Sequence, residues 1–211
     1  MIRVLIADDH PIVREGLKQV IEKSPDMRVA GEAESGQDVL DCVAREEWDV
    51  LILDFSMPGK SGLDVLQALR SERPDLPVLV LSMHPEAELA PRLLKAGASG
   101  YLTKESAPKE LVNAIRKLHD GGRYVSPALA EKLAADLAGG AVRPPHELLS
   151  DREYQVLLAI AAGKSAHDVA AELSISVKTV RTYRDRIMEK LGLTNDVELS
   201  RYALENRLVA R

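Results

Sequence analysis

Acidic, hydroxyl and amine side chains follow several short apolar runs in the first half of the chain. Asp8 and Asp9 follow one run, Asp54 a second, Ser82 a third and Lys104 a fourth. The carboxyl ends of parallel strands meet at one sheet edge, so these side chains are expected to converge. Three carboxylates repel one another unless a hard cation lies between them, and Mg²⁺ fits such a site. Lys104 and Ser82 supply the donors that could hold a phosphoryl group on a carboxylate.

The apolar runs predict the sheet that positions these side chains. Short β-branched runs are predicted as strands, and the amphipathic stretches between them as helices. The predicted strands cover residues 4–7, 28–30, 50–53, 78–81 and 100–102, and the predicted helices cover 12–21, 37–44, 63–69, 89–95 and 109–118. Three strands are almost wholly apolar, which is typical of strands buried on both faces. The first half is therefore predicted to be a doubly wound α/β fold with a five-stranded parallel sheet.

Each candidate residue, taken alone, also has a simpler structural interpretation. One Asp at a strand end is most often a helix cap or a turn former, but three at one edge, with a hydroxyl and a lysine, favour a site. Packing or a solvated helix edge accounts for Cys42, Trp48 and His119, which are assigned no role. No Gly-x-x-x-x-Gly-Lys loop or Gly-x-Gly-x-x-Gly turn occurs, so nucleotide binding is poorly supported.

The second half is predicted to be helical. Gly and Pro pairs between residues 120 and 147 flank one predicted helix, 127–137, and indicate a linker. Ser150 and Glu153 form a capping-box pattern before an apolar run that Gly163 ends. Further helices are predicted over 169–173, 177–191 and 197–204. The three-residue turn 174–176 has the length found in a helix-turn-helix.

The predicted helix over 177–191 concentrates positive charge. Its apolar residues Val177, Val180, Tyr183, Ile187 and Leu191 share one face. The other face is expected to bind DNA, although a merely solvated face is the alternative for any charged helix. Phosphate contacts are expected from Lys178, Arg186 and Lys190, and base contacts from Arg181 and Thr182, with Thr179 and Asp185 on the same surface. Arg184, nearer the packed face, is expected to pair with an acid such as Glu153.

Composition limits the protein class. The 211 residues carry a net charge of −5, which argues against wholesale coating of nucleic acid or anionic membrane. The single cysteine, Cys42, excludes an internal disulfide and a zinc finger, and fits a reducing cytoplasm. No run approaches ~18 apolar residues, so neither a signal peptide nor a spanning helix is expected. Aromatic residues make up 3% of the chain, too few for large base-stacking platforms. A cytoplasmic protein without a membrane partner is predicted.

The residues at the predicted sheet edge resemble the receiver domain of bacterial two-component response regulators. The resemblance covers residues 1–120 and includes Asp54 in Leu-Asp-Phe-Ser-Met-Pro-Gly and Lys104 in Tyr-Leu-Thr-Lys. It implies a flavodoxin-like fold, with Asp54 as the phosphoacceptor and Tyr101 as an aromatic switch residue behind Ser82. By the same resemblance, Mg²⁺ is held by Asp8 through water, by Asp9, by Asp54 and by the backbone carbonyl of Ser56.

Some positions depart from the common receiver pattern. Ser82 stands where Thr is commoner, and Glu105 stands where many receivers have Pro. The resemblance also places Ser56 and His84 beside the route of the attacking water, where they are expected to tune dephosphorylation.

Residues 147–211 resemble the LuxR-type DNA-binding domain. The segments 149–157, 169–173, 175–180 and 187–192 carry this resemblance. Tyr183 and Arg186 replace the frequent His and Asn of the motif. Such domains dimerise through their last helix, here expected over residues 197–204, whose Val197, Leu199 and Leu204 would otherwise be core residues. The whole chain thus resembles a NarL/FixJ-family response regulator, with receiver 1–120, linker 121–146 and a smaller all-α helix-turn-helix domain 147–211.

The resemblance implies a phosphorylation-controlled transcription factor rather than an enzyme. Its implied partners are a sensor histidine kinase, a double-stranded DNA operator, RNA polymerase and a second copy of the chain. Two alternatives use the same residues. A metal-dependent phosphatase could use these carboxylates but would have little use for a helix-turn-helix. An interaction module that has lost phosphorylation would not need the complete set of acids, hydroxyl and lysine.

Overall fold

The chain folds into two compact units, Met1–Lys132 and Leu133–Arg211, and each is considered by itself. The computed structural model describes residues 1–57, 60, 62–83, 86–137, 144–173, 175–206 and 208–209. His84, Gly139, Gly140 and Ser174, which entered the sequence-based expectations, lie outside the described residues.

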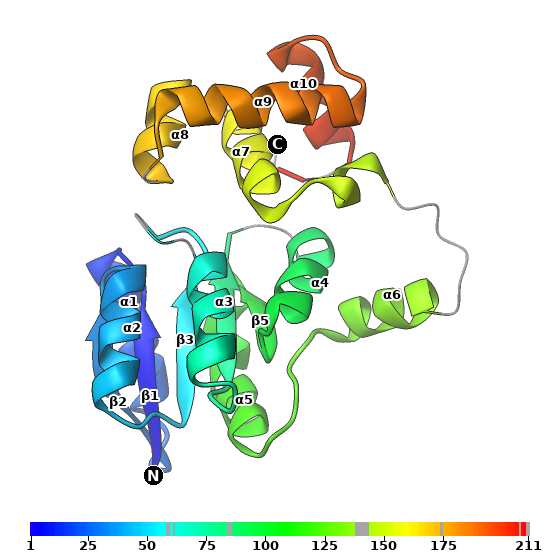
Figure 1. Cartoon of the computed structure of the whole chain (residues 1–211). Helices are drawn as coiled ribbons and strands as arrows, with labels where there is room; N and C mark the ends of the chain where they lie inside the picture. The colour runs from blue at the N-terminus through cyan, green and yellow to red at the C-terminus, as the bar shows by residue number, and fades with distance from the viewer. Residues whose placement is uncertain are drawn as a thin grey trace. The chain divides into compact units, whose positions relative to one another are not determined.

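A five-stranded parallel sheet forms the centre of the first unit (Figure 1). Its strands are β1 (Ile2–Ala7), β2 (Met27–Ala33), β3 (Val50–Asp54), β4 (Val78–Ser82) and β5 (Gly100–Thr103), in the order β2-β1-β3-β4-β5. Ile6 pairs with Ile52, and Leu53 pairs with Val80. Every residue of β3 and β4 is buried, as predicted from their apolar sequences. The strand order reverses beside β1 and β3, where open α/β sheets form their sites.

Helices cover both faces of this sheet. They are α1 (Pro11–Ile21), α2 (Gly36–Arg45), α3 (Gly62–Glu72), α4 (Glu86–Ala96) and α5 (Ala107–His119). Helix α1 contacts α5, whereas α3 contacts both α2 and α4, so the helices form two layers with the sheet between them (Figure 1). The predicted doubly wound, flavodoxin-like fold is confirmed, and each predicted element is present with slightly longer bounds.

Trp48 packs at the end of the sheet where β3 begins. Its ring is buried, and its Nε1 donates to the Cys42 carbonyl oxygen at 3.2 Å. The Arg3 guanidinium lies 5.3 Å from the ring centroid. Because Trp48 precedes β3 and Asp54 ends it, the two residues lie toward opposite ends of that strand. Of the two roles expected for Trp48, packing or a solvated helix edge, its burial agrees with packing.

The chain after α5 extends the sheet by one residue. Tyr124 N donates to Ser99 O at 3.1 Å, and Tyr101 N donates to Tyr124 O at 3.0 Å. The Tyr124 hydroxyl donates to Glu110 at 2.7 Å. The first residues of the predicted linker therefore pack on the first unit. Helix α6 (Pro127–Leu137) follows and crosses the division between the units.

The second unit is a small helical bundle. It contains the 3₁₀ helix η1 (Pro145–Leu148) and the helices α7 (Asp151–Ala161), α8 (Ala166–Glu172), α9 (Val177–Leu191) and α10 (Asp196–Glu205). Helix α9 contacts η1, α7 and α8, and α7 also contacts α10. Val156, Val169, Val180 and Leu199 are fully buried between these helices. The predicted helix-turn-helix is thus present as α8 and α9.

Local signals set the ends of these helices. The Ser150 hydroxyl accepts from Glu153 N at 3.3 Å while Ser150 N donates to the Glu153 carboxylate at 2.7 Å, which confirms the predicted capping box. Ser176 caps α9 by accepting from Thr179 N at 3.0 Å. Gly192 ends α9 with φ +67°, a left-handed conformation that favours glycine.

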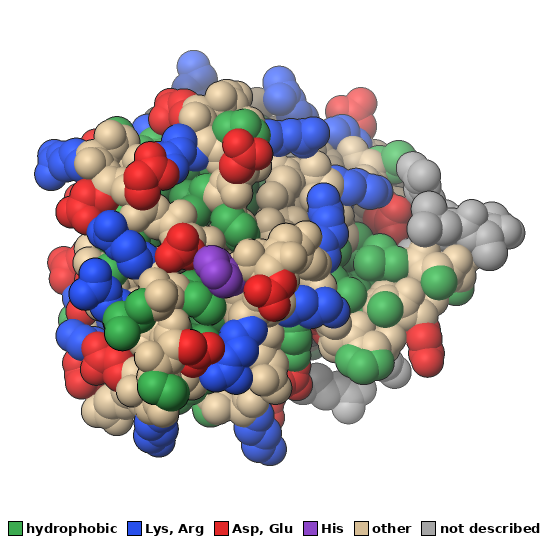
Figure 2. Space-filling model, turned by 90° about the horizontal axis from the view of Figure 1, so that it is seen from below, with side chains coloured by type: hydrophobic (Ala, Val, Ile, Leu, Met, Phe, Trp, Pro, Cys, Tyr) green, Lys and Arg blue, Asp and Glu red, His purple; other side chains and the backbone are tan. Residues whose placement is uncertain are grey.

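The described surface is charged and mixed in sign. Figure 2 shows one face, on which Lys and Arg side chains are interspersed with Asp and Glu side chains. Two of the surface ion pairs join distant parts of the sequence, Arg3 with Glu46 and Arg116 with Asp26. Among the described residues, no helix has the length and apolar character needed to cross a membrane.

Candidate functional site

The carboxyl edge of the sheet brings the predicted site residues together. Asp8 follows β1, while Asp54 and Ser82 are the last residues of β3 and β4. Lys104 follows β5 directly. Asp8 and Asp54 are each 1% exposed, and Ser82 is fully buried. Four of the five strands thus bring polar residues to the same edge of the sheet, as the strand assignments predicted.

The ammonium of Lys104 joins two of the carboxylates. Its Nζ donates to Asp8 Oδ2 at 2.7 Å and to Asp54 Oδ2 at 2.9 Å. The Lys104 backbone N donates to the Ser82 carbonyl oxygen at 2.8 Å, which fixes the residue against β4. One positive charge therefore lies between two buried acids of separate strands.

Burial and this ion pair move the pKa values of both partners. Burial raises the pKa of the Asp54 carboxyl above its usual value, although the hydrogen bond from Lys104 opposes that rise. Burial also acts to lower the pKa of Lys104, but the hydrogen bonds to Asp8 and Asp54 outweigh it and leave that pKa raised. Lys104 therefore stays charged beside the carboxylate that it contacts.

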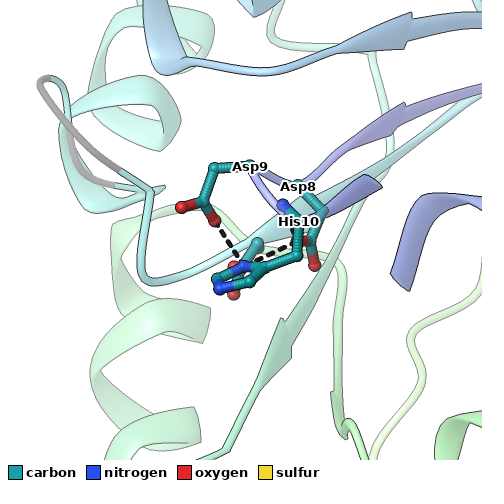
Figure 3. Close-up of side chains that lie close together, drawn as sticks. Asp8, Asp9 and His10 are labelled. Carbon is teal, nitrogen blue, oxygen red and sulfur yellow. Dashed lines mark hydrogen bonds and ion pairs between the residues drawn. The ribbon is translucent and has the colours of Figure 1, made fainter. Parts of the chain in front are cut away.

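His10 is a member of this cluster that the sequence analysis did not identify. Its ring Nδ1 lies 2.8 Å from Asp9 Oδ1 and 3.3 Å from Asp8 Oδ1. Figure 3 shows the ring turned toward both carboxylates. Ligand atoms of Asp8, Asp9, His10 and Asp54 all lie within 4.8 Å of one another. In the sequence, the signal that could have identified His10 was its position directly after Asp8 and Asp9.

Arg14 supports this cluster from α1 and was also missed. Its side chain is 8% exposed, and its Nη1 donates to the Asp8 carbonyl oxygen at 2.7 Å. The remaining donors reach Glu32 at 3.1 Å and Glu34 at 2.5 Å. The planar Arg14 guanidinium carries several donors in a fixed geometry, which suits this bridging position. Arg14 thereby ties the end of β1 to α1 and to the end of β2.

Ser56 lies beside Asp54 and Tyr101 beside Ser82, the positions that the receiver resemblance implies. Ser56 N donates to Asp54 Oδ1 at 3.2 Å, so the Ser56 backbone lies beside the acid. Tyr101 is fully buried, and burial raises the pKa of its phenol despite a hydrogen bond with Ser82. The aromatic residue and the pocket hydroxyl are therefore in direct contact.

The donor set fits a hard divalent cation. Carboxylate oxygens from Asp8, Asp9 and Asp54 approach one another closely, and the Ser56 backbone is adjacent. Oxygen ligands, few of them supplied by protein and the rest by water, are what Mg²⁺ prefers. The side chain of Asp9 is 28% exposed, which leaves one side of the cluster open for water ligands.

Helix α9 of the second unit presents most of the predicted DNA-contact residues to solvent. Five of these side chains are exposed and one is half-buried along the helix: Lys178, Thr179 (half-buried), Arg181, Thr182, Asp185 and Arg186. Two hydroxyls make bonds within the unit, since Thr179 Oγ1 lies 2.8 Å from Ser176 Oγ and Thr182 donates to Lys178 O at 3.1 Å. On the opposite face Val180, Ile187 and Met188 are buried.

The prediction that Arg184 pairs with Glu153 is wrong. Arg184 Nε donates to Asp196 at 2.6 Å, at the start of α10, and not to Glu153. Glu153, which is 3% exposed, instead accepts from Lys190 Nζ at 2.6 Å. Lys190 of α9 is therefore the residue that meets Glu153 of α7. Lys190 is thus engaged within the unit rather than free for a phosphate.

Helix α10 presents two of its three expected interface residues. Val197 is 79% exposed and Leu204 is 44% exposed, whereas Leu199 is fully buried in the core. Leu199 is therefore a core residue of the unit, which was the alternative stated for these side chains, and it is not available on a dimer surface.

Comparison with known proteins gives both units a family. Residues 4–116 match the response regulator receiver domain, and residues 147–203 match the bacterial regulatory proteins of the LuxR family. The receiver match covers more than half of the chain. The two matches fall in the separate compact units, which carry the acidic pocket and the helix-turn-helix.

Relatives resemble the chain over almost its whole length. It is 36% identical over 209 residues to the response regulator UvrY of Escherichia coli K12, covering 99% of this chain and 96% of that protein. It is 38% identical over 214 residues to the response regulator GacA of Pseudomonas aeruginosa, covering 99% and 98%.

Solved structures agree with this assignment. RcsB of Salmonella enterica bound to promoter rprA in the presence of phosphomimetic BeF₃⁻ matches with TM-score 0.71 at 30% identity, covering 95% of this chain and 97% of that chain. A second RcsB structure, from Salmonella typhimurium, matches with TM-score 0.76 at 29% identity, covering 99% and 98%. The chain belongs to the NarL/FixJ-family response regulators, DNA-binding transcriptional regulators of two-component signalling with a receiver and a LuxR-type DNA-binding domain.

Proposed function

We propose that Asp54 accepts a phosphoryl group from a sensor histidine kinase and that this modification controls DNA binding by the second unit. The observation that carries the proposal is the buried Asp54 carboxylate with Lys104 Nζ at 2.9 Å. An Asp54 oxygen attacks phosphorus, the bond from phosphorus to the kinase histidine nitrogen breaks, and the histidine retains that electron pair. The product is an acyl phosphate on Asp54.

The surrounding side chains support this transfer. The Lys104 ammonium and the Ser82 hydroxyl would donate to the phosphoryl oxygens. Asp9, Asp54 and the Ser56 carbonyl would hold Mg²⁺, with Asp8 acting through water; the bound ion would neutralise charge on the incoming phosphoryl group. Tyr101, in contact with Ser82, would reorient when that serine moves toward the phosphoryl group. An added charge acts only through an element with two states, and this contact offers one.

Helix α9 is proposed to bind the major groove of a double-stranded operator. Lys178 and Arg186 would contact phosphates, while Arg181 and Thr182 would contact bases, with Thr179 and Asp185 beside them. The RcsB structures bound to promoters support this use of the homologous domain. Lys190 would join the phosphate contacts only after leaving Glu153.

The proposed organisation is a receiver over 1–120, a linker over 121–146 and a DNA-binding domain over 147–211. A homodimer would form through α10, where Val197 and Leu204 are exposed apolar side chains. RNA polymerase is the further partner of a transcription regulator. We place the protein in the cytoplasm, with the DNA that it regulates, and expect no turnover of small phosphoesters.

Phosphorylation is tested with acetyl phosphate and Mg²⁺, followed by intact-mass analysis. Wild type is expected to gain one phosphoryl group, and Asp54→Asn none, because the amide keeps the volume but removes the nucleophilic oxygen charge. Asp75→Asn, at an exposed position, is the matched control and should be phosphorylated like wild type. An unchanged phosphoprotein peak in Asp54→Asn would assign the modification to another residue.

A further inference from the structure

A hollow of about 250 Å³ lies at the end of the first unit where the strands begin. Its walls come from the ends of α3 and α4, from the start of β4 and from the segment after α5. The strands are parallel and Asp54 ends β3, so this hollow is separate from the acidic pocket. Figure 2 is seen from below the view of Figure 1 and looks onto this end of the sheet. None of the described lining residues is acidic, and four are cationic: Arg70, Arg73, Lys95 and Arg123.

The floor of the hollow is apolar and closed. Four side chains that are buried in the first unit form it: Leu66, Leu69, Leu76 and Val78. They leave little apolar surface for a ligand, whereas Arg70, Lys95 and Arg123 are exposed. Charge rather than apolar contact would therefore decide what binds here.

Contacts within the unit use only part of the donors around the hollow. Arg70 Nη1 donates to the Lys95 carbonyl oxygen at 3.1 Å, near the end of α4. Arg73 Nη1 donates to the Val43 carbonyl oxygen at 3.1 Å, and its Nη2 pairs with Glu47. A guanidinium carries five N–H donors, so Arg70 keeps donors beyond the one that faces α4.

Stabilisation of helix ends accounts for part of the positive charge. Arg70 and Lys95 lie in the last turns of α3 and α4, where each helix end carries roughly −0.5 charge. Glu47 balances Arg73. About two of the four positive charges are therefore left uncompensated. Within the part of the chain that the structure describes, Arg70, Lys95 and Arg123 form no ion pair with an acid.

Backbone hydrogen bonds hold Arg123 at the rim of the hollow. Gly122 N donates to the Lys117 carbonyl oxygen at 2.9 Å, and Tyr124 N donates to the Ser99 carbonyl oxygen at 3.1 Å. The residues on both sides of Arg123 are thus bound, one to α5 and one to the residue before β5. A rim that is already fixed costs less ordering when a ligand binds.

We propose that this hollow binds a diphosphate group, either free or within a nucleoside diphosphate, through the guanidinium groups of Arg70 and Arg123. Guanidinium forks bind pairs of phosphate oxygens. A diphosphate presents more terminal oxygens and more charge than a carboxylate does, so it can serve two arginines at once and balance the remaining positive charge. The bound group would join α3 to the segment that leads to α6.

Calorimetric titration of the full chain with sodium pyrophosphate in metal-free buffer tests this site. The absence of metal prevents a bridged contact with the acidic pocket. Wild type should bind pyrophosphate, and Arg123→Gln should bind it at least about tenfold more weakly, because a charged donor is lost. Arg28→Gln removes an exposed arginine of β2, the strand at the other edge of the sheet, and should retain wild-type affinity. Equal affinity of these two variants would overturn the proposal.

Nuclear magnetic resonance of the ¹⁵N-labelled full chain locates the bound pyrophosphate. The cationic helix α9 is the rival site for a multivalent anion. Shifts of backbone amide signals should fall on residues 94–97 and 122–124, which surround the hollow. Shifts confined to residues 177–191 would overturn the proposal, because the anion would then occupy the predicted DNA-binding surface.

Titration with ADP distinguishes the two sources of the diphosphate group. Affinity for ADP at or above that for pyrophosphate, with the same loss in Arg123→Gln, would assign the site to nucleoside diphosphates. Weaker binding of ADP than of pyrophosphate would assign it to the free anion. Binding of neither by wild type would overturn the proposal.

Discussion

Lys104 Nζ lies 2.9 Å from Asp54 Oδ2 and is the same ammonium that lies 2.7 Å from Asp8 Oδ2. Both acids are buried, and the Lys104 side chain itself is only 15% exposed. Two carboxylates from different strands therefore share one cation. A phosphoryl group on Asp54 would meet this ammonium without a long movement of the β5 end. The arrangement also makes the stability of the first unit depend on Lys104.

Lys104→Ala should destabilise the first unit in EDTA by about 1–3 kcal/mol, because two buried carboxylates lose a charged donor. Adding Mg²⁺ should restore part of this loss, since a cation then returns to the cluster. Urea unfolding followed by tryptophan fluorescence measures the effect. Trp48 is the one tryptophan of the sequence and is buried in the first unit, so the signal reports that unit.

Lys95→Ala is the matched control, because Lys95 is an exposed lysine near the end of α4. Its unfolding midpoint should equal that of wild type with and without Mg²⁺. Equal midpoints for Lys104→Ala and wild type in EDTA would contradict a structural role of the Lys104 ion pairs.

The sheet and most of its acidic pocket could be predicted from the sequence, because strand ends and side-chain chemistry are local features. The apolar run before Asp54 fixes both a buried strand and the edge at which it ends. His10 and Arg14 could not be predicted in this way. Their importance depends on where the side-chain atoms of Asp8 and Glu32 lie across the loop and the neighbouring strand.

In the second unit, helical periodicity predicts which residues of α9 are buried but not which residues they contact. A projection of α9 separates its buried Val180 from its exposed Arg181. It does not determine whether Arg184 or Lys190 meets Glu153, because that depends on where α7 and α10 cross α9. The structure pairs Lys190 with Glu153 and Arg184 with Asp196.

The Glu153 pair predicts a dependence of stability on pH. Burial opposes ionisation of Glu153, but the hydrogen bonds from Lys190 and Ser150 prevail and hold the pKa of its carboxyl below the usual value. A folded-state pKa below the unfolded value adds stability above the unfolded pKa, and this stability is lost as pH falls through the folded pKa. Glu153→Gln should therefore lower the melting temperature near neutral pH, with the difference shrinking below about pH 4.

Circular-dichroism melts of residues 144–211 across this pH range measure that difference. Glu147→Gln changes an exposed glutamate of η1 and should follow wild type at every pH. A difference between Glu153→Gln and wild type that stays constant down to about pH 3 would show that ionisation of Glu153 does not stabilise the bundle.

Lys178→Ala and Arg181→Ala should weaken DNA binding in different ways. Both side chains are exposed on α9. Loss of a phosphate contact at Lys178 should weaken binding to all sequences and reduce the salt slope by about 1. Loss of a base contact at Arg181 should cost about 1–3 kcal/mol on the operator and relax its base preference. Binding isotherms over salt concentration and operator variants separate the two, and identical behaviour would mean that α9 lies differently in the groove.

Phosphorylation at Asp54 should tighten DNA binding indirectly. Asp54 is buried in the first unit, and the net negative charge of the chain lies within residues 1–125, which would repel DNA phosphates. The phosphoryl group must therefore act by promoting dimerisation or by releasing the second unit. Dimeric helix-turn-helix units should recognise paired half-sites spaced by about one helical turn.

A fragment of residues 144–211 distinguishes these two routes. It begins before His146, which is buried and whose Nδ1 lies 3.0 Å from the Tyr202 hydroxyl of α10; a fragment starting at residue 147 would lose this contact. Mobility-shift titrations compare the fragment with the phosphorylated and unphosphorylated full chain. If phosphorylation releases the unit, the fragment should bind better than the unphosphorylated chain. If phosphorylation drives dimerisation, the fragment should bind worse than the phosphorylated chain, and equal affinity of all three species would mean that the receiver does not control DNA binding.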